Sequence, residues 1–428
     1  MGRYIFLFLI LGLFTASYAK QGGKIVIKEI LANKSVVLFK QTQGKGIIAG
    51  TIFIKGGSIE DPEGKKGLTN LTFRLLLKGT KNFDFSSFHQ LFEDSGGYIS
   101  ASAGDEYSTI EFAVKVEDFE PALARIKDLL FNPLFPEDKL TQEKINTIAQ
   151  IKAKKEEGFS YAIDELRKEI YKGTPYQYST LGEIEDIEKI EIEDIRKRWK
   201  QLLKGGRFVI SFVGDIHYKD VKPLVEETFS KLEDVNYSYP DIEIEIKGKR
   251  CKTLKREGTQ STIVVAYNAP KAKEKYYFPF KVLNGILGNG FTSRLFQELR
   301  ERRGLAYAVG SFYPTKINVG NLFIYMGTAP QNTEEALEGI YQVVDSIKKG
   351  ISEEEIKTAK EKFIGHYLLD HQTRAKQSWY LGWFEVIGFG YEMDEKYVDY
   401  INQVTAKDII DAWNTYIPKG SFCVIVRP

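Results

Sequence analysis

The sequence predicts an α+β fold made of two related lobes, and three observations support this prediction. The chain has 428 residues, more than one ordinary hydrophobic core accommodates, so two or more domains are expected. An order of helix, strand, strand, helix, helix occurs once in each half. The similar segments EPALARI at 120–126 and EEALEGI at 334–340 occupy the same place in that order. A duplicated α+β domain is the simplest explanation.

In the first half, strand-like runs cover 24–30, 35–40 and 46–55. A helical segment ends at FHQLFEDSGG and is followed by the strand YISAS. STIEFAVKV then alternates apolar and polar residues with the period of a strand, and EPALARIKDLL is typical of a helix. A second helix is expected after Pro136.

The second half repeats this order. SRLFQELRERRG is expected to be a helix, LAYAVGSFY and GNLFIYMGT strands, and EEALEGIYQVVDSI a helix, with a long helix after about Ser352. Between the halves lies a charged, turn-rich stretch that includes Pro240. We therefore predict an N-terminal lobe at 20–232, a linker at 233–258 and a C-terminal lobe at 259–428.

The N-terminus has the pattern of a secretory signal peptide. Arg3 supplies a positive charge, residues 4–14 are apolar, and Ser17 and Ala19 place small residues where a signal peptidase acts. We expect residues 1–19 to be removed and the protein to be periplasmic or otherwise exported. An uncleaved membrane anchor is the alternative, although the apolar run is short for a bilayer. No later segment predicts stable membrane insertion.

The charges and the cysteines limit the possible partners and cross-links. There are 60 Lys and Arg against 58 Asp and Glu, and no basic block stands out, so nucleic acid is not an expected partner. Export would permit a disulfide. Cys251 lies in the linker-like stretch and Cys423 in a predicted strand near the C-terminus, and these places favour two unpaired or buried thiols over a disulfide.

The sequence contains no intact catalytic constellation that we can identify. His366 and His371, two of four histidines, are five residues apart on a predicted helix, about 140° around its axis, and could not hold one metal from one face. A G-x-S-x-G elbow, a Walker loop and a dinucleotide fingerprint are all missing. The family resemblance described next is therefore the main guide to function.

The segment GLTNLTFRLLLKGT at 67–80 resembles the zinc-site helix of the pitrilysin/insulinase-type metallopeptidases, whose motif is H-x-x-E-H. In the processing-peptidase branch of that family, the motif lies between a Gly and a Lys-Gly-Thr, and Gly67 and 78–80 match these. The positions of the two histidine ligands fall on Asn70 and Arg74, and the position of the general base falls on Phe73. Gln150, in the predicted helix EKINTIAQIKAK, stands where the family has its third ligand, a Glu.

A second segment, GNGFTSRLFQELRERRGLAYAVGSFY, resembles the other signature of the family at nearly every position. In active members an Arg and a Tyr from this region bind the substrate backbone and stabilise the tetrahedral intermediate. We match them to Arg294 and Tyr307, whereas Arg300 on the same helix has no matched role. Without the resemblance, Arg294 would be an ordinary helix residue and Tyr307 an ordinary strand residue.

The resemblance implies two homologous lobes, each an antiparallel sheet with helices on one face, that form a clam-like chamber. It further implies a non-catalytic, substrate-binding subunit of a heteromeric exported zinc metallopeptidase. This chain would hold no metal, and a homologous partner would carry the zinc and cleave extended peptides with help from Arg294 and Tyr307. An exported peptide-binding or scaffold protein with no peptidase role is the alternative. A self-sufficient hydrolase with other catalytic residues has no motif to support it.

Overall fold

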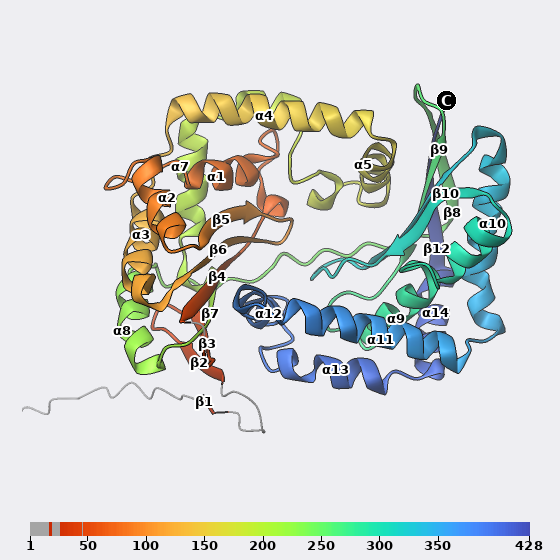
Figure 1. The fold of residues 1–428 in the computed structure, drawn as a ribbon. Coiled ribbons are helices and arrows are strands. Elements are labelled where there is room, and N and C mark those ends of the chain that lie inside the picture. The colour runs from red at the N-terminus through yellow and green to blue at the C-terminus, as the bar shows by residue number, and fades with distance from the viewer. Residues whose placement is uncertain (1–16, 19–25, 45) are drawn as a thin grey trace, which may run out of the picture.

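The computed structural model describes residues 17–18, 26–44 and 46–428 (Figure 1). The predicted signal peptide therefore lies outside the described residues, apart from the two-residue strand β1 (Ser17–Tyr18). Within the described part of the chain, no helix is long and apolar enough to cross a membrane. Two sheets with their helices form two lobes, and the predicted α+β fold class is confirmed.

The N-terminal lobe contains a seven-stranded sheet in the order β1-β2-β3-β7-β4-β6-β5. The strands after β1 are β2 (Val26–Ile30), β3 (Val36–Gln41), β4 (Ile47–Lys55), β5 (Tyr98–Ala103), β6 (Tyr107–Lys115) and β7 (Phe208–Gly214). The sheet is antiparallel except where β3 lies parallel to β7. The predicted alternation in β6 is present, since Ile110, Phe112 and Val114 are buried in one core. β5 is the outermost strand and has one unpaired edge.

The C-terminal lobe contains a five-stranded sheet in the order β10-β11-β9-β12-β8. Its strands are β8 (Gly248–Lys255), β9 (Ser261–Asn268), β10 (Ala306–Phe312), β11 (Asn321–Thr328) and β12 (Gly420–Arg427). Only β8 and β12 pair in parallel. β8 falls within the predicted linker 233–258, so the connection between the lobes is shorter than expected. The strand is a mostly exposed edge strand without an apolar face, and its sequence therefore resembles a polar linker.

Helices cover the outer face of each sheet (Figure 1). The N-terminal helices are α1 (Leu68–Leu76), α2 (Phe85–Asp94), α3 (Phe119–Phe131), α4 (Glu137–Glu156), α6 (Ile184–Lys189), α7 (Ile192–Leu202) and α8 (Tyr218–Phe229). The C-terminal ones are α9 (Tyr277–Gly288), the π-helix η5 (Phe296–Arg302), α10 (Thr333–Asp345), α11 (Glu353–Asp370), α13 (Met393–Gln403) and α14 (Ala406–Tyr416). Each set buries one large apolar core against its sheet.

The two remaining long helices pack on the sheet of the other lobe. α5 (Gly158–Ile170), from the first half of the chain, packs on β9 and β12, and α12 (Arg374–Val386), from the second half, packs on β4 and β7. The approach of α12 is close, because a Cβ on Gly382 would lie 2.6 Å from Phe53 Cε2. Ser211 Oγ of β7 also donates to the carbonyl oxygen of Ser378 at 2.7 Å. Helices therefore cover both faces of each sheet, not one face as predicted.

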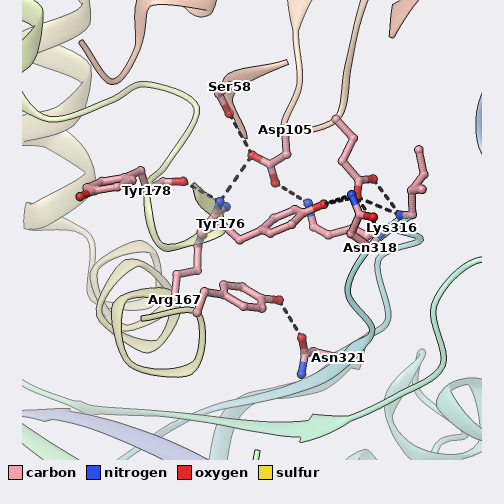
Figure 2. Close-up of polar contacts among 11 residues, drawn as sticks. Ser58, Asp105, Arg167, Tyr176, Tyr178, Lys316, Asn318 and Asn321 are labelled. Atoms are coloured by element: carbon pink, nitrogen blue, oxygen red, sulfur yellow. Dashed lines mark hydrogen bonds and ion pairs between the residues drawn. The ribbon is translucent and has the colours of Figure 1, made fainter. Parts of the chain in front are cut away.

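A polar cluster joins the lobes at the turn between β5 and β6 (Figure 2). Glu106 accepts hydrogen bonds from the backbone amides of Ile317 at 2.9 Å and Asn318 at 3.1 Å, in the loop between β10 and β11. Asp105 forms ion pairs with Lys316 of that loop and with Arg167 of α5. Since these groups come from both halves of the chain, the cluster fixes the β5–β6 hairpin against the C-terminal lobe.

The two cysteines form a disulfide, so the prediction of two thiols is wrong. Cys251 of β8 and Cys423 of β12 lie directly opposite each other in the parallel pair, with their Cα atoms 4.4 Å apart. The error follows from the missed strand. Once residues 248–255 join the sheet, the register places one cysteine beside the other.

We predict that Cys251→Ser lowers the free energy of unfolding by about 2–4 kcal/mol, because the bond closes a long loop in the unfolded chain. Cys251 is exposed, so the serine leaves no buried cavity. Denaturant unfolding of both proteins measures the difference, and repetition in excess reductant is the control. Equal unfolding curves under oxidising conditions would contradict the prediction.

The Asp105 ion pairs predict a pH-dependent loss of stability. Burial alone would raise the pKa of Asp105, but Lys316 and Arg167 outweigh it and hold that pKa below its usual value. Because the pKa of Asp105 is lower in the folded than in the unfolded protein, its ionised carboxylate stabilises the fold at pH values above the unfolded pKa of about 4. This stabilisation is lost as the pH falls below that value. Asp105→Asn should therefore be less stable by roughly 3 kcal/mol at neutral pH.

The difference between wild type and Asp105→Asn should shrink as the pH falls below about 4. Chemical unfolding at several pH values measures it. Asp241→Asn, at an exposed position, is the matched control and should follow the wild type throughout. A deficit of Asp105→Asn that is the same at every pH would rule out this account.

Candidate functional site

A tight loop and a buried carboxylate position the start of α1. Gly67, which precedes the helix, has a φ of 94°, and a Cβ there would lie 2.5 Å from the carbonyl oxygen of Leu181. Asp61 accepts hydrogen bonds from the backbone amides of Gly67 and Thr69, both at 3.0 Å. Gly67 is thus required by the backbone, independently of any chemistry on the helix.

Three of the four positions matched to the zinc chemistry come together in the structure. Arg74 lies one turn after Asn70 on α1, and its Nε donates to Asn70 Oδ1 at 3.4 Å. Arg74 Nη2 donates to Gln150 Oε1 on α4 at 2.6 Å. The alignment of these positions therefore corresponds to a real spatial cluster.

Phe73 lies apart from this cluster. Its side chain is 1% exposed and packs edge-on against Trp199 of α7, with ring centroids 5.9 Å apart. The position matched to the general base thus stabilises the core and offers no proton acceptor.

These residues do not fit a zinc ion. Zinc sites in proteins use imidazole, thiolate or carboxylate ligands, whereas the three matched positions hold two amides and a guanidinium. Arg74 places a fixed positive charge where the cation would lie, and it pairs with Glu143 of α4 at 3.4 Å. Lys78 approaches the same carboxylate at 2.9 Å. Across the described residues, no group of three or more His, Cys, Asp or Glu side chains could hold a metal.

In the C-terminal lobe, Arg294 is occupied by contacts within the lobe. Its Nε donates to Glu355 Oε1 at 2.5 Å, Nη1 to Ser346 Oγ at 3.0 Å, and Nη2 to the carbonyl oxygen of Gly350 at 2.8 Å. The hydrogen bond from Arg294 lowers the pKa of Glu355 to about 2. Since all three guanidinium nitrogens have partners, Arg294 ties the start of α11 to the segment before η5.

Tyr307 is open to solvent and lies at an irregular point of the outermost strand β10. Its side chain is 59% exposed. Ala306 pairs with Thr328 and Ala308 with Gly327, which leaves Tyr307 as the extra residue of a β-bulge. Bulges re-aim side chains and are common next to functional sites.

The structure places Arg300 beside Tyr307, and it does not bring Arg294 to that position. Arg300 Nη1 donates to the carbonyl oxygen of Tyr307 at 2.8 Å, and the Arg300 side chain is exposed. Arg300 lies on the π-helix η5, a rare conformation that is frequent at functional sites. The sequence holds one signal for this pair: Gly304, with a φ of 62°, reverses the chain between the two residues.

The chain is similar to proteins of one family along most of its length. The model of insulinase (peptidase family M16) matches residues 36–184, and the model of the peptidase M16 inactive domain matches residues 189–363. The Bacillus subtilis "uncharacterized zinc protease YmxG" is 27% identical, over 84% of this chain and 85% of its own. A Helicobacter pylori protein described as a non-peptidase homolog is 26% identical, over 94% of this chain and 93% of its own.

A solved structure supports the fold. The crystal structure of a peptidase M16 inactive domain from Pseudomonas fluorescens superposes with a TM-score of 0.87 and 23% sequence identity. The match covers 94% of this chain and 98% of that one. The two-lobed architecture is therefore shared with solved members of this family.

We predict that Arg294→Ala destabilises the protein by about 2–3 kcal/mol, because it leaves Glu355 without its charged partner. Arg302→Ala is the matched control, since its side chain is 74% exposed and its loss should cost at most about 0.5 kcal/mol. Thermal and denaturant unfolding measure both. Similar stability of the two variants would show that the Arg294 contacts are not structural.

Proposed function

The chain belongs to the peptidase M16 (insulinase) family, and from this premise we propose that it is a non-catalytic, substrate-binding subunit of an exported zinc peptidase. The observation that carries the proposal is the contrast between the two halves. The zinc positions hold Asn70, Arg74 and Gln150 in a cluster that does not suit a metal. The C-terminal signature keeps an exposed Arg and Tyr pair on a π-helix and a bulge.

In this proposal Arg300 and Tyr307 supply hydrogen bonds to a peptide held at the zinc of a homologous partner chain. A guanidinium forms charge-assisted hydrogen bonds with a peptide carbonyl, and a phenol can donate to a developing oxyanion. The geometry favours Arg300 for this role over Arg294, because the guanidinium of Arg294 is engaged within its own lobe. The partner would supply the metal and the activated water.

The edges of the two sheets support an extended peptide as the substrate. β5 and β10 each end a sheet, and an extended peptide can add to such an edge through backbone hydrogen bonds. Because α5 and α12 cover the facing surfaces of the two sheets, we propose that the peptide chamber is completed by the partner chain. The disulfide fits with an oxidising, exported location.

An exported peptide-binding or scaffold protein with no peptidase role is the second candidate. The name of the Helicobacter pylori relative, a non-peptidase homolog, favours it. In that case Arg300 and Tyr307 would not affect hydrolysis by any partner. The same experiment separates the two functions.

We predict that Arg300→Ala and Tyr307→Phe each reduce peptide cleavage by the assembled pair roughly 100-fold, because each removes one donor from the transition state. The variants are mixed with the unaltered zinc-bearing partner, and turnover of a fluorogenic peptide is measured. Assembly, followed by size-exclusion chromatography, should not change.

Arg302→Ala is the matched control for this assay, because Arg302 lies on the same π-helix and pairs with Glu298. It should cleave at the wild-type rate. If both site variants lose less than about threefold while the complex stays intact, the scaffold function is favoured.

A further inference from the structure

The cluster on α1 and α4 has more hydrogen-bond donors than acceptors. Arg74 and Lys78 carry two positive charges, and both approach the single carboxylate of Glu143, at 3.4 and 2.9 Å. The Asn70 Nδ2 is buried and has no acceptor among the described residues. One positive charge and the Asn70 Nδ2 group are therefore left uncompensated.

The contacts that Arg74 does make are mostly weak. Its bonds to Asn70 and Glu143 are both 3.4 Å long, and only the bond to Gln150, at 2.6 Å, is short. The side chains of Arg74 and Lys78 are 27% and 28% exposed, so both can be reached from solvent. A carboxylate on this side would gain shorter, charge-assisted hydrogen bonds.

A second buried polar group at the same place is unpaired. Thr147 lies between Glu143 and Gln150 on the face of α4 that carries both, since residues three and four apart are neighbours on a helix. Its side chain is fully buried, and its Oγ1 has no hydrogen-bond partner. Buried polar groups are nearly always paired. The Thr147 hydroxyl is shielded from solvent, so it is the unpaired Asn70 amide, next to the partly exposed Arg74, that points to a missing acceptor.

The position of the cluster indicates what kind of ligand it would meet. α1 packs against β5, which is the outermost strand of its sheet. Tyr98, Ser100 and Ser102 of that strand are exposed. A peptide that adds to the free edge of β5 as a further strand would run close to α1.

We propose that the altered zinc helix is a carboxylate-binding site for an extended peptide, with Arg74 as the charge partner and the Asn70 amide as a second donor. The proposal rests on the proposed function in one respect, namely that the chain binds extended peptides. The carboxylate can be the C-terminus of the peptide or the side chain of an Asp or Glu, since both present the same two oxygens. Because the amides and the guanidinium of this cluster do not suit a zinc ion, the site would hold the peptide without cleaving it.

The test uses the mature chain alone and three labelled peptides of one neutral, unstructured sequence: one with a free C-terminal carboxylate, one amidated, and one amidated with an internal Glu. Fluorescence anisotropy at low salt gives the dissociation constants. At least one carboxylate peptide should bind roughly 10-fold more tightly than the neutral amide. If only the peptide with the free C-terminus binds more tightly, the site recognises a C-terminal carboxylate. If only the Glu peptide binds more tightly, it recognises a side-chain carboxylate.

Arg74→Gln should abolish the carboxylate preference and leave the affinity for the amidated neutral peptide unchanged. Lys78 still pairs with Glu143 in this variant, so the fold should be kept. Arg196→Gln, which removes an exposed arginine that pairs with Glu193, is the matched control and should keep the preference.

Equal affinity of the unaltered chain for all three peptides, or a preference that survives Arg74→Gln, would overturn this inference. Neither result would affect the role of Arg300 and Tyr307, which is measured by cleavage with the partner. Conversely, if Arg300→Ala and Tyr307→Phe did not reduce cleavage, the proposed peptidase role would be refuted. The carboxylate preference would not be affected by that result.

Discussion

Two-sided burial of the central strands is the constraint on which the rest of this structure depends. β7 and β9 are buried along their whole length, and β12 along all but its last residue. A strand buried in this way has an apolar group on each face, and outer helices can cover only one of them. The other face is covered by α12 in the first sheet and by α5 in the second, each contributed by the opposite half of the chain. Neither lobe could close its core alone.

This exchange of helices also holds the candidate sites in fixed positions. The β5–β6 turn is tied to the loop between β10 and β11 by Asp105 and Glu106, and Arg167 of α5 joins the same cluster. The outermost strand β5, which passes next to α1, is therefore anchored at one end to the C-terminal lobe. Gly67 and Asp61 position α1 through a backbone contact that does not depend on the side chains at Asn70, Phe73 and Arg74.

The two family signatures differ in what their side chains now do. On α1, Phe73 is part of the apolar core and Arg74 carries a fixed positive charge that binds Gln150. In the second signature, Arg294, which precedes the π-helix, is engaged by groups of its own lobe, whereas Arg300 on the π-helix is exposed and donates to the carbonyl oxygen of the exposed Tyr307 on β10. The wider turn of a π-helix and the extra residue of the bulge are local departures from regular structure, and such departures persist where a side chain must point in a particular direction.

The sequence by itself determined the α+β class and the two related lobes, because periodicity and short motifs are local properties of the chain. Asn70 and Arg74 are one helical turn apart, a spacing that a helix preserves, whereas Gln150 is 76 residues beyond Arg74 and meets it only in the folded chain. The tertiary structure alone decided the pairing of Cys251 with Cys423, the strand at 248–255, the exchange of α5 and α12, and the contact of Arg300 with the Tyr307 carbonyl oxygen. Each of these depends on a partner distant in the chain or on irregular backbone geometry. The strand at 248–255 is an exposed edge strand, so it has no apolar pattern that the sequence could reveal. The helical repeat of the sequence is that of an α-helix, so it does not predict that a π-helix brings Arg300 to Tyr307.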